Sequence, residues 1–294
     1  MKFELDEDQR DFAAALESLL SGAGTVAAAR AWAEGDHAPG LGLWKRLADL
    51  GVLSLATDAS SVEVVIAFEA LGRHAVPGPW VESAAYLPIA LGREVEGVAT
   101  VALPPHVPYA LDADVADEVY VGASLATGVG ERVTSVDRTR RLFRVEGAAS
   151  DSGESDREAI DLAVLATAAQ LLGAGERVLA DSVDYVKQRT QFGRPIGSYQ
   201  AIKHALADVR IALDFARPLV HGAALGEIDV SAAKLAAGDA AYLASRVGLQ
   251  VHGAIGYTAE FDLSLWLTKI RALVTAWGTP DFHRGRLAQQ LGLD

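Results

Sequence analysis

The spacing of apolar and polar positions divides the chain into a helical start, a short β-rich middle and a helical second half. Residues 1–95 carry apolar side chains every three or four positions, as in LDEDQRDFAAALESLL, which is typical of amphipathic helices. Residues 96–154 hold short β-branched runs broken by Gly, Pro and Asp, which predicts a small sheet or partial barrel. Residues 155–294 return to helical spacing. We therefore predict a mainly α fold with a small β-domain.

Several helix starts carry a capping box, in which two residues three positions apart satisfy each other's backbone N–H groups. The pairs with this spacing are Asp6 with Gln9, Ser60 with Glu63, and Ser155 with Glu158. A further helix is predicted to begin near Pro79, because proline is favoured in the first turn of a helix.

The second half of the chain predicts long helices joined by short turns, which is the pattern of an antiparallel bundle. The first helix is expected over residues 156–189, roughly 50 Å long at the usual rise per residue. Its first half is apolar almost all round, so it should be buried in the bundle or at an interface. The later helices are expected at about 198–225, 230–252, 261–276 and 280–291.

The composition and net charge of the chain argue against several classes of function. The net charge of −13 argues against binding to nucleic acid or to anionic membranes. The chain has no cysteine, which excludes disulfides, thiolate catalysis and cysteine-ligated metals, and fits a cytoplasmic location. Its longest apolar run, between Asp161 and Glu176, is too short for a membrane span, and its start lacks the pattern of a secretory signal.

The stretch YVKQRTQFGRPIGSYQAIKHALADV, residues 185–209, concentrates candidate binding groups. Arg189 ends a helix, where by itself it would be explained as a cation complementing the helix dipole. Phe192 and a Gly-containing turn with free backbone N–H groups follow, and Gln200 stands at the next helix start. A guanidinium, amide donors and an aromatic face suit the adenosine diphosphate half of a dinucleotide.

This stretch resembles the signature of the acyl-CoA dehydrogenase family, an Arg, two residues, Phe-Gly, and a Gln about eleven residues after the Arg. Downstream, LQVHGAIGYTAEFDLSLWLTKIRALVTAWGT is similar to the Gln-x-x-Gly-Gly-x-Gly-Tyr turn of the family and the helices after it. By itself HGAIGY would be a plain helix-to-helix turn ended by glycine. FELDEDQRDF and LWKRLADLGVLSLA also resemble the N-terminal domain of the family. The resemblance covers most of the chain and is strongest after residue 160.

The resemblance implies an N-terminal helical domain (1–95), a reduced middle β-domain (96–154) and a C-terminal helical bundle (155–294). It also implies FAD, bound where two subunits meet, with both motifs reaching the FAD of the neighbouring chain. Carried over, Arg189 and Gln191 would hold the pyrophosphate, Phe192 and Gln200 would surround the adenosine, and Gln250, Gly253 and Ala254 would approach the FAD. Ala254 stands where the family usually has Gly, and His252 is expected to be a turn or flavin-edge residue rather than part of a metal site.

The chain departs from the family where the chemistry takes place. The reaction of the family needs a carboxylate to remove the α-proton of the thioester. Trp277, in AWGT, occupies the usual position of that Glu, and Ala163 occupies the alternative position on the first bundle helix. Asp161 is near Ala163 but faces elsewhere on the helix. Trp277 either fills the space of a substrate or packs in the core as Trp266 does, and both can hold.

The middle domain also lacks the Thr-Glu-Pro…Gly-Ser-Asp stretch with which the family covers the flavin ring. The leading hypothesis is therefore a non-catalytic subunit of an α2β2 acyl-CoA dehydrogenase. A full-length homologue would supply the Glu and hold most of the acyl-CoA, with half as many FADs as chains. By analogy with paired members of the family, the substrate would be bulky, such as a steroid-derived acyl-CoA in actinobacteria, and the electron acceptor a flavoprotein.

Two alternatives stay open. One is a self-sufficient homomeric enzyme with a relocated carboxylate, for which Asp161, Asp262 and Asp281 are the candidates. The other is a structural or regulatory homologue without flavin. The intact turn around Arg189 argues against the second alternative, because a pure scaffold has no need of it.

Overall fold

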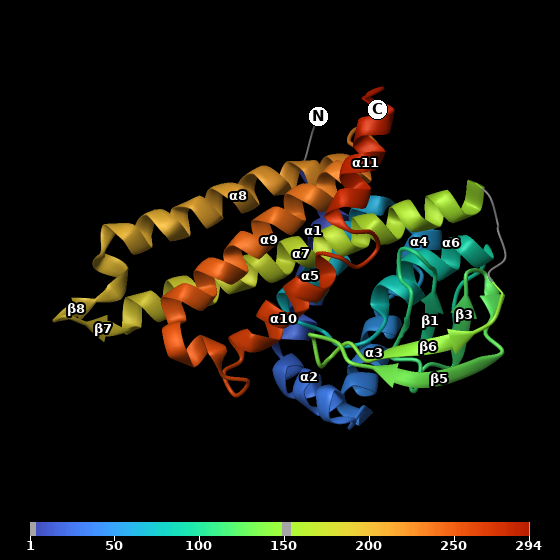
Figure 1. Ribbon diagram of the computed structural model, residues 1–294, viewed down its shortest axis with the longest axis horizontal. Coiled ribbons are helices and arrows are strands. Elements are labelled where there is room, and N and C mark those ends of the chain that lie inside the picture. Colours follow the sequence, from blue (N-terminus) through green and yellow to red (C-terminus); the bar gives the residue numbers. More distant parts are fainter. Residues whose placement is uncertain (1–3, 149–153, 294) are drawn as a thin grey trace.

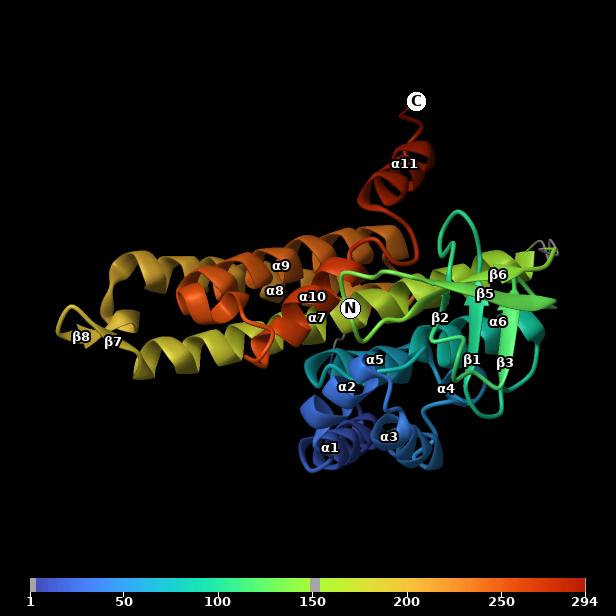
Figure 2. The same ribbon diagram turned by 60° about the horizontal axis from the view of Figure 1, so that its bottom comes forward.

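The structure is a computed structural model that describes residues 4–148 and 154–293 (Figure 1). Long helices of the second half lie side by side as an elongated bundle, with the small sheets at one end of it. The N-terminal helices pack along one side of the bundle, as the turned view shows (Figure 2). The fold is mainly α with a small β region, as the spacing of apolar residues predicted.

The N-terminal part is helical throughout, and two of its capping boxes are confirmed. Its helices are α1 (Glu7–Ser21), α2 (Thr25–Glu34), α3 (Ala38–Asp49), α4 (Leu55–Asp58), α5 (Ser61–Arg73) and α6 (Leu87–Leu91). Asp6 with Gln9 caps α1, and Ser60 with Glu63 caps α5. The side chain of Ser155, from the third predicted pair, lies outside the described residues. The helix predicted near Pro79 contains a π-helical turn, Glu82–Tyr86, just before α6.

The β region consists of two small three-stranded sheets rather than one continuous sheet. Its strands are β1 (Ala99–Ala102), β2 (Ala110–Leu111), β3 (Glu118–Val121), β4 (Ser124–Leu125), β5 (Gly128–Val133) and β6 (Leu142–Glu146). The first sheet has the order β1-β3-β4, with β1 and β3 parallel, and the second has the order β2-β6-β5. The β-branched run ERVTSVD predicts a strand over residues 131–137, but β5 begins and ends earlier than this run. The pairing of β5 with β6 shifts register between Val129 and Arg132.

The C-terminal half forms the predicted bundle, with helix ends within three residues of their expected positions. Its elements are α7 (Glu154–Gln188), a hairpin of β7 (Thr190–Gln191) and β8 (Arg194–Pro195), α8 (Gln200–Ala224), α9 (Val230–His252), α10 (Leu263–Leu273) and α11 (Pro280–Gln290). Short 3₁₀ turns, Ile196–Ser198 and Gly253–Tyr257, precede α8 and follow α9.

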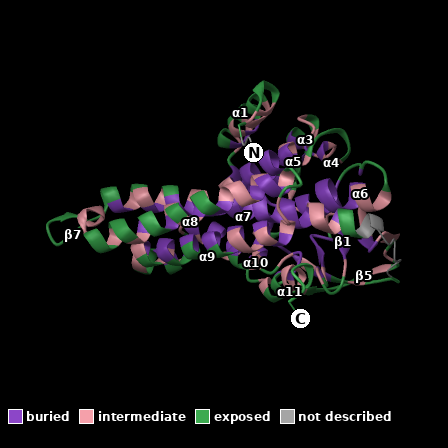
Figure 3. Cartoon of the chain, turned by 90° about the horizontal axis from the view of Figure 1, so that it is seen from above, coloured by how far each residue is buried: buried purple, intermediate pink, exposed green. Residues whose placement is uncertain are grey.

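Helix α7 is the central element of the molecule. By length and composition it could cross a membrane, but 83% of its apolar window is buried inside the structure, as in the core helix of a globular protein. Buried residues are concentrated where α5 and α7 meet, and exposed residues line α8 and the hairpin (Figure 3). The apolar surface of α7 is therefore covered by this chain's own helices.

Helices α5 and α7 cross with their backbones in contact. A Cβ on Gly173 would collide with the carbonyl of Glu69, and a Cβ on Gly72 would collide with the carbonyl of Gln170. Beside this crossing the largely buried Glu69 carboxylate accepts two hydrogen bonds from Arg217 of α8, each 3.0 Å long. Arg217 also donates to Glu176 of α7 at 3.0 Å. The crossing requires glycine on both helices, and the ion pairs join α8 to it.

We predict that Gly173→Ala lowers the free energy of unfolding by about 1–3 kcal/mol or more, because the backbone of α5 cannot yield to a methyl group. Gly238→Ala on α9 is the control, since a Cβ there has nothing within 4 Å. It should leave stability unchanged or raise it by about 0.5–1 kcal/mol, through helix propensity. Urea unfolding followed by circular dichroism measures both, and equal effects would contradict the described crossing.

Candidate functional site

The two sequence motifs lie at the same end of the bundle, away from the sheets (Figure 1). Tyr185, in the last turn of α7, stacks on His252, in the last turn of α9, with ring centroids 4.2 Å apart. Phe261 packs on His252 from another side, at 5.3 Å. These aromatic contacts join the segment that leads to Arg189 to the segment that leads to Gly253, so both motifs belong to one surface.

The hairpin β7–β8 holds its aromatic residue in a strained and exposed position. Phe192 and Gly193 form its two-residue turn, with φ of 54° and 80°. Positive φ at both positions is the geometry of a type I′ turn, which favours Asn-Gly and disfavours a bulky first residue. The ring of Phe192 is 91% exposed. Backbone strain of this kind is concentrated at binding and active sites.

Arg189 presents a free guanidinium at the base of this hairpin. Its backbone is held firmly, because its N–H donates to Tyr185 and its carbonyl accepts from Ile196, at 2.9 and 2.8 Å. Its side chain is exposed and makes no hydrogen bond or ion pair within the described residues. Arg194, across the hairpin, instead lies over the ring of Tyr199 at 4.1 Å. Gln191 and Gln200 are also exposed, so the polar groups of the motif are available to a ligand.

The second motif borders a groove of about 970 Å³ at the end of α9. Gln250 and Gly253 line it, and Ala254 is exposed beside it. Gly253 ends α9 with φ 62° and ψ −138°, a conformation that a residue with a Cβ adopts only with strain. All seven residues expected at an FAD therefore lie on the surface of this end of the bundle.

Sequence reasoning missed Arg246, which also lines the groove. It stands four residues before Gln250 on α9, so the two side chains share a helix face. Arg246 is exposed and forms no ion pair among the residues that the structure describes. The i, i+4 spacing from Gln250 was the available signal, and it places a second free cation beside the second motif.

His252 has a structural role in this arrangement. It is 5% exposed, and its Nδ1–H donates to the carbonyl of Gly248 at 2.7 Å. Across the described parts of the chain, no group of three or more His, Asp or Glu side chains is arranged to hold a metal ion. The imidazole is enclosed by Tyr185, Phe261 and the Gly248 carbonyl, and it fixes the turn that follows α9.

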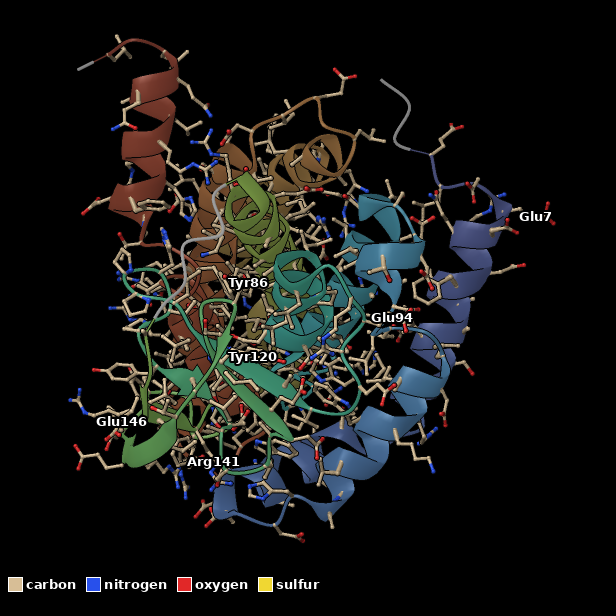
Figure 4. All side chains as sticks on the ribbon, turned by 90° about the vertical axis from the view of Figure 1, so that its right-hand side faces the viewer. Glu7, Tyr86, Glu94, Tyr120, Arg141 and Glu146 are labelled. Atoms are coloured by element: carbon tan, nitrogen blue, oxygen red, sulfur yellow. The ribbon has the colours of Figure 1, made fainter. Side chains whose placement is uncertain are left out.

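Trp277, at the expected position of a catalytic carboxylate, is enclosed in the core. It is 1% exposed and its ring lies 5.0 Å from that of Tyr86, which is labelled in Figure 4. Its φ is 57°, and that of Gly278 is 109°. A Cβ on Gly278 would lie 2.6 Å from Nε2 of His283, so the turn after Trp277 requires glycine. The indole packs in the core as Trp266 does, and the local backbone is built around it.

Glu82 is a buried carboxyl beside Trp277 that sequence reasoning missed. It is 1% exposed, and neither of its oxygens has a hydrogen-bond partner of normal geometry in the described chain. Burial raises the pKa of Glu82, while the charge of Arg140 and the Trp277 indole offset part of that increase. Its position in the apolar run WVESAAY was the available signal. It is a carboxyl in a closed interior that favours its neutral form.

The other carboxylates considered as relocated bases are all in ion pairs. Asp161 accepts from Arg286 at 2.7 Å, and Asp262 accepts from Arg30 at 2.8 Å. Asp281 pairs with Arg284 at 3.0 Å and its side chain is 95% exposed. Ala163 is fully buried. All three aspartates are therefore held by an arginine, and Asp281 is also a solvated surface group.

Comparison with known proteins identifies the family of this arrangement. The family description "Acyl-CoA dehydrogenase, C-terminal domain" matches residues 154–292. The chain is 31% identical over 288 residues to Acyl-CoA dehydrogenase IpdE2 of Mycobacterium tuberculosis, covering 90% of this chain and 91% of that protein.

Solved structures of the same fold align with nearly the whole chain. The ChsE4–ChsE5 complex from Mycobacterium tuberculosis superposes with a TM-score of 0.80 at 22% identity, covering 100% of both chains. A Mycobacterium smegmatis glutaryl-CoA dehydrogenase in complex with FADH2 gives 0.84 at 16% identity, over 98% of this chain and 95% of that one. The Tcur3481–Tcur3483 steroid ACAD gives 0.79 at 19% identity, over 97% and 98%.

The strain at Phe192 generates a first prediction for this site. Phe192→Asn creates the preferred Asn-Gly turn and should raise the free energy of unfolding of the chain by roughly 1 kcal/mol. Phe215→Asn is the control, because Phe215 is 73% exposed on α8 and lies in an ordinary helix. It should lower stability slightly, since Asn is a poorer helix former. Loss of stability in Phe192→Asn would show that the ring packs on this chain.

The buried His283 generates a second prediction. Its Nε2–H donates to the carbonyl of Trp277 at 3.1 Å, and its Nδ1 accepts from Ser231 at 3.0 Å. Burial first, and then Lys234, lower the pKa of His283 from 6.5 to about 4. The unfolded chain therefore takes up the proton first, so this contribution to stability is complete above pH 6.5 and is lost as the pH falls toward about 4.

Replacing His283 by Gln should accordingly reduce the fall in unfolding free energy between those two pH values. His204→Gln, at an exposed histidine of α8, is the control and should leave the pH profile unchanged. Urea titrations at a series of pH values measure the difference. A profile of His283→Gln that parallels the unsubstituted protein would contradict a neutral, buried His283.

Proposed function

This chain belongs to the acyl-CoA dehydrogenase family, and from that premise we propose that it is a subunit of a heteromeric FAD-dependent acyl-CoA dehydrogenase. In this proposal it completes the FAD site of a full-length partner and leaves the removal of the substrate proton to that partner. The observation that carries the proposal is the hairpin at residues 189–195, which directs a free Arg189 and a strained, exposed Phe192 away from the chain's own core.

The described surface fits the adenosine diphosphate part of FAD. The free guanidinium of Arg189 and the amide of Gln191 suit the pyrophosphate, and Phe192 with Gln200 suits the adenosine. Gln250, Gly253 and Ala254 suit a close approach at the neighbouring turn, and Arg246 adds a second cation there. When bound, FAD would supply the acceptor for a hydride from the substrate. The residues of this chain would bind and orient it.

The interior supports the absence of a catalytic base in this subunit. A general base has to reach the proton that it removes. Trp277 and Ala163 have no carboxylate, and Glu82 is enclosed in the core, where burial raises the pKa of its carboxyl. The burial of Trp277 against Tyr86 also closes the space that a substrate would need. These features support a partner that supplies the Glu and holds most of the acyl-CoA.

The proposed assembly is an α2β2 heterotetramer with one FAD for every two chains. Its support is the similarity to a protein solved as the ChsE4–ChsE5 complex, together with exposed apolar residues on the bundle. These residues are Ile211, Phe215, Tyr242, Leu243, Ile255 and Tyr257. We propose a bulky, steroid-derived acyl-CoA as substrate, by analogy with the steroid ACAD of similar fold, and a flavoprotein as electron acceptor. If this chain has lost its own substrate pocket, the substrate pocket of the partner would have more space for a large acyl group.

The test is to purify the chain alone and after co-expression with a full-length homologue encoded beside it. Visible absorbance and native mass then give the flavin content and the stoichiometry. We expect a colourless chain alone and a yellow tetramer with one FAD per two chains. A lone chain that is yellow with one FAD per chain would support the homomeric alternative instead. A complex without flavin would support a structural role.

Within the complex, Arg189→Ala should weaken FAD binding by about 10- to 100-fold, the usual effect of losing charge-assisted hydrogen bonds to a phosphate. Lys187→Ala is the matched control, because Lys187 is an exposed cation two residues earlier that pairs with Asp184. Flavin released during gel filtration and FAD titration of the apo-complex measure the affinity. Equal retention in the two variants would place the pyrophosphate elsewhere.

A further inference from the structure

A second groove lies at the other end of the molecule, between the loop that joins β5 to β6 and helix α10. It has a volume of about 280 Å³. Its lining residues include Arg140 and the hydroxyl-bearing Tyr109, Ser135 and Thr275. Leu142 and Ala272 contribute apolar wall. The groove is remote from the hairpin, and the sequence analysis assigned nothing to it.

Arg140 is the unusual member of this groove. It is only 9% exposed, yet its side chain makes no hydrogen bond or ion pair with any described residue. Its neighbours are all paired: Arg138 with Glu34 at 2.7 Å, Arg141 with Asp114, and Arg144 with Glu131 at 3.4 Å. Arg141 is labelled in Figure 4, which views this end of the molecule. A buried guanidinium cannot lose its proton, so leaving it unpaired is costly.

The buried carboxyls on which the charge of Arg140 acts, Glu82 and Asp112, accept no hydrogen bond from it. Burial raises the pKa of both groups, that of Asp112 to about 7, and the charge of Arg140 opposes part of that increase. Burial, and after it the charge of Arg140, lower the pKa of Lys234 to about 7. Lys269 is already engaged with Asp137 at 3.6 Å. No described carboxylate accepts a hydrogen bond from the Arg140 side chain, and an anion in the groove would provide that partner.

We propose that this groove binds a small organic carboxylate, with Arg140 as the group that recognises it. A guanidinium and a carboxylate form two parallel hydrogen bonds in one plane, and Ser135 and Thr275 are among the lining residues. The apolar wall suits a short alkyl or aryl body, whereas a phosphate dianion would meet one cation and apolar surface. The volume is at the small end of ligand sites, below that of a nucleotide or a CoA ester.

The test is calorimetric titration of the full chain, alone and in its complex, with benzoate, butyrate and inorganic phosphate. We expect one saturable site per chain for benzoate or butyrate, with phosphate failing to compete. Arg140→Gln should weaken binding by about tenfold or more. Arg144→Gln, at a nearby exposed arginine, is the control and should bind normally. Absence of saturable carboxylate binding, or equal binding of phosphate, would overturn the proposal.

Ala272→Leu provides a second variant that keeps Arg140 and fills the groove from α10. It should abolish carboxylate binding while circular dichroism and thermal unfolding remain those of a folded protein. Binding that survives in both variants would also overturn the proposal. The flavin content of the same samples is recorded separately, so failure of this site is distinguishable from failure of the proposed FAD role.

Discussion

The fold depends on the contact between the backbones of α5 and α7. Gly72 and Gly173 allow the two helices to approach until carbonyl groups fill the space that side chains would occupy. Close approach also brings Glu69 and Glu176 within reach of Arg217, so that α8 joins the same junction through charge-assisted hydrogen bonds. The N-terminal helices, the bundle and, through α7, the hairpin are all positioned from this one crossing. The two proposed binding surfaces lie at opposite ends of the molecule.

These two ends have opposite physical characters. At the hairpin, the chain maintains strain and exposure, since Phe192 keeps a positive φ and its ring stays in solvent. Near the sheets, Trp277 and Tyr86 close the interior, and the carboxyl of Glu82 is buried without a hydrogen-bond partner of normal geometry in the described chain. At the first end, the strained and exposed residue does not stabilise the isolated chain. At the second end, side chains fill the interior. Both features support the proposal that the hairpin surface serves another subunit.

Local features of the fold were predictable from the sequence, and features created by distant contacts were not. Helix ends and the boxes at Asp6 and Ser60 follow from residues close in sequence, so spacing alone was sufficient. The π-helical turn at Glu82–Tyr86 and the parallel pairing of β1 with β3 depend on packing between segments far apart. The two motifs were predictable because each is a run of neighbouring residues. Whether the side chains of Arg140 and Arg246 are paired depends on residues distant in sequence, so it could be determined only from the structure.

The continuity of α7 has a consequence for how this protein can change in evolution. Its 35 residues run without interruption past the glycine crossing to the hairpin. Inserting or deleting one residue between Gly173 and Arg189 would turn the hairpin by about 100° around the helix axis and shift it by about 1.5 Å. Substitutions in this segment are expected to be tolerated where packing allows, whereas a change in its length is not, because it would move the hairpin. The number of residues between the glycine crossing and the proposed binding surface therefore fixes how that surface is oriented relative to the core.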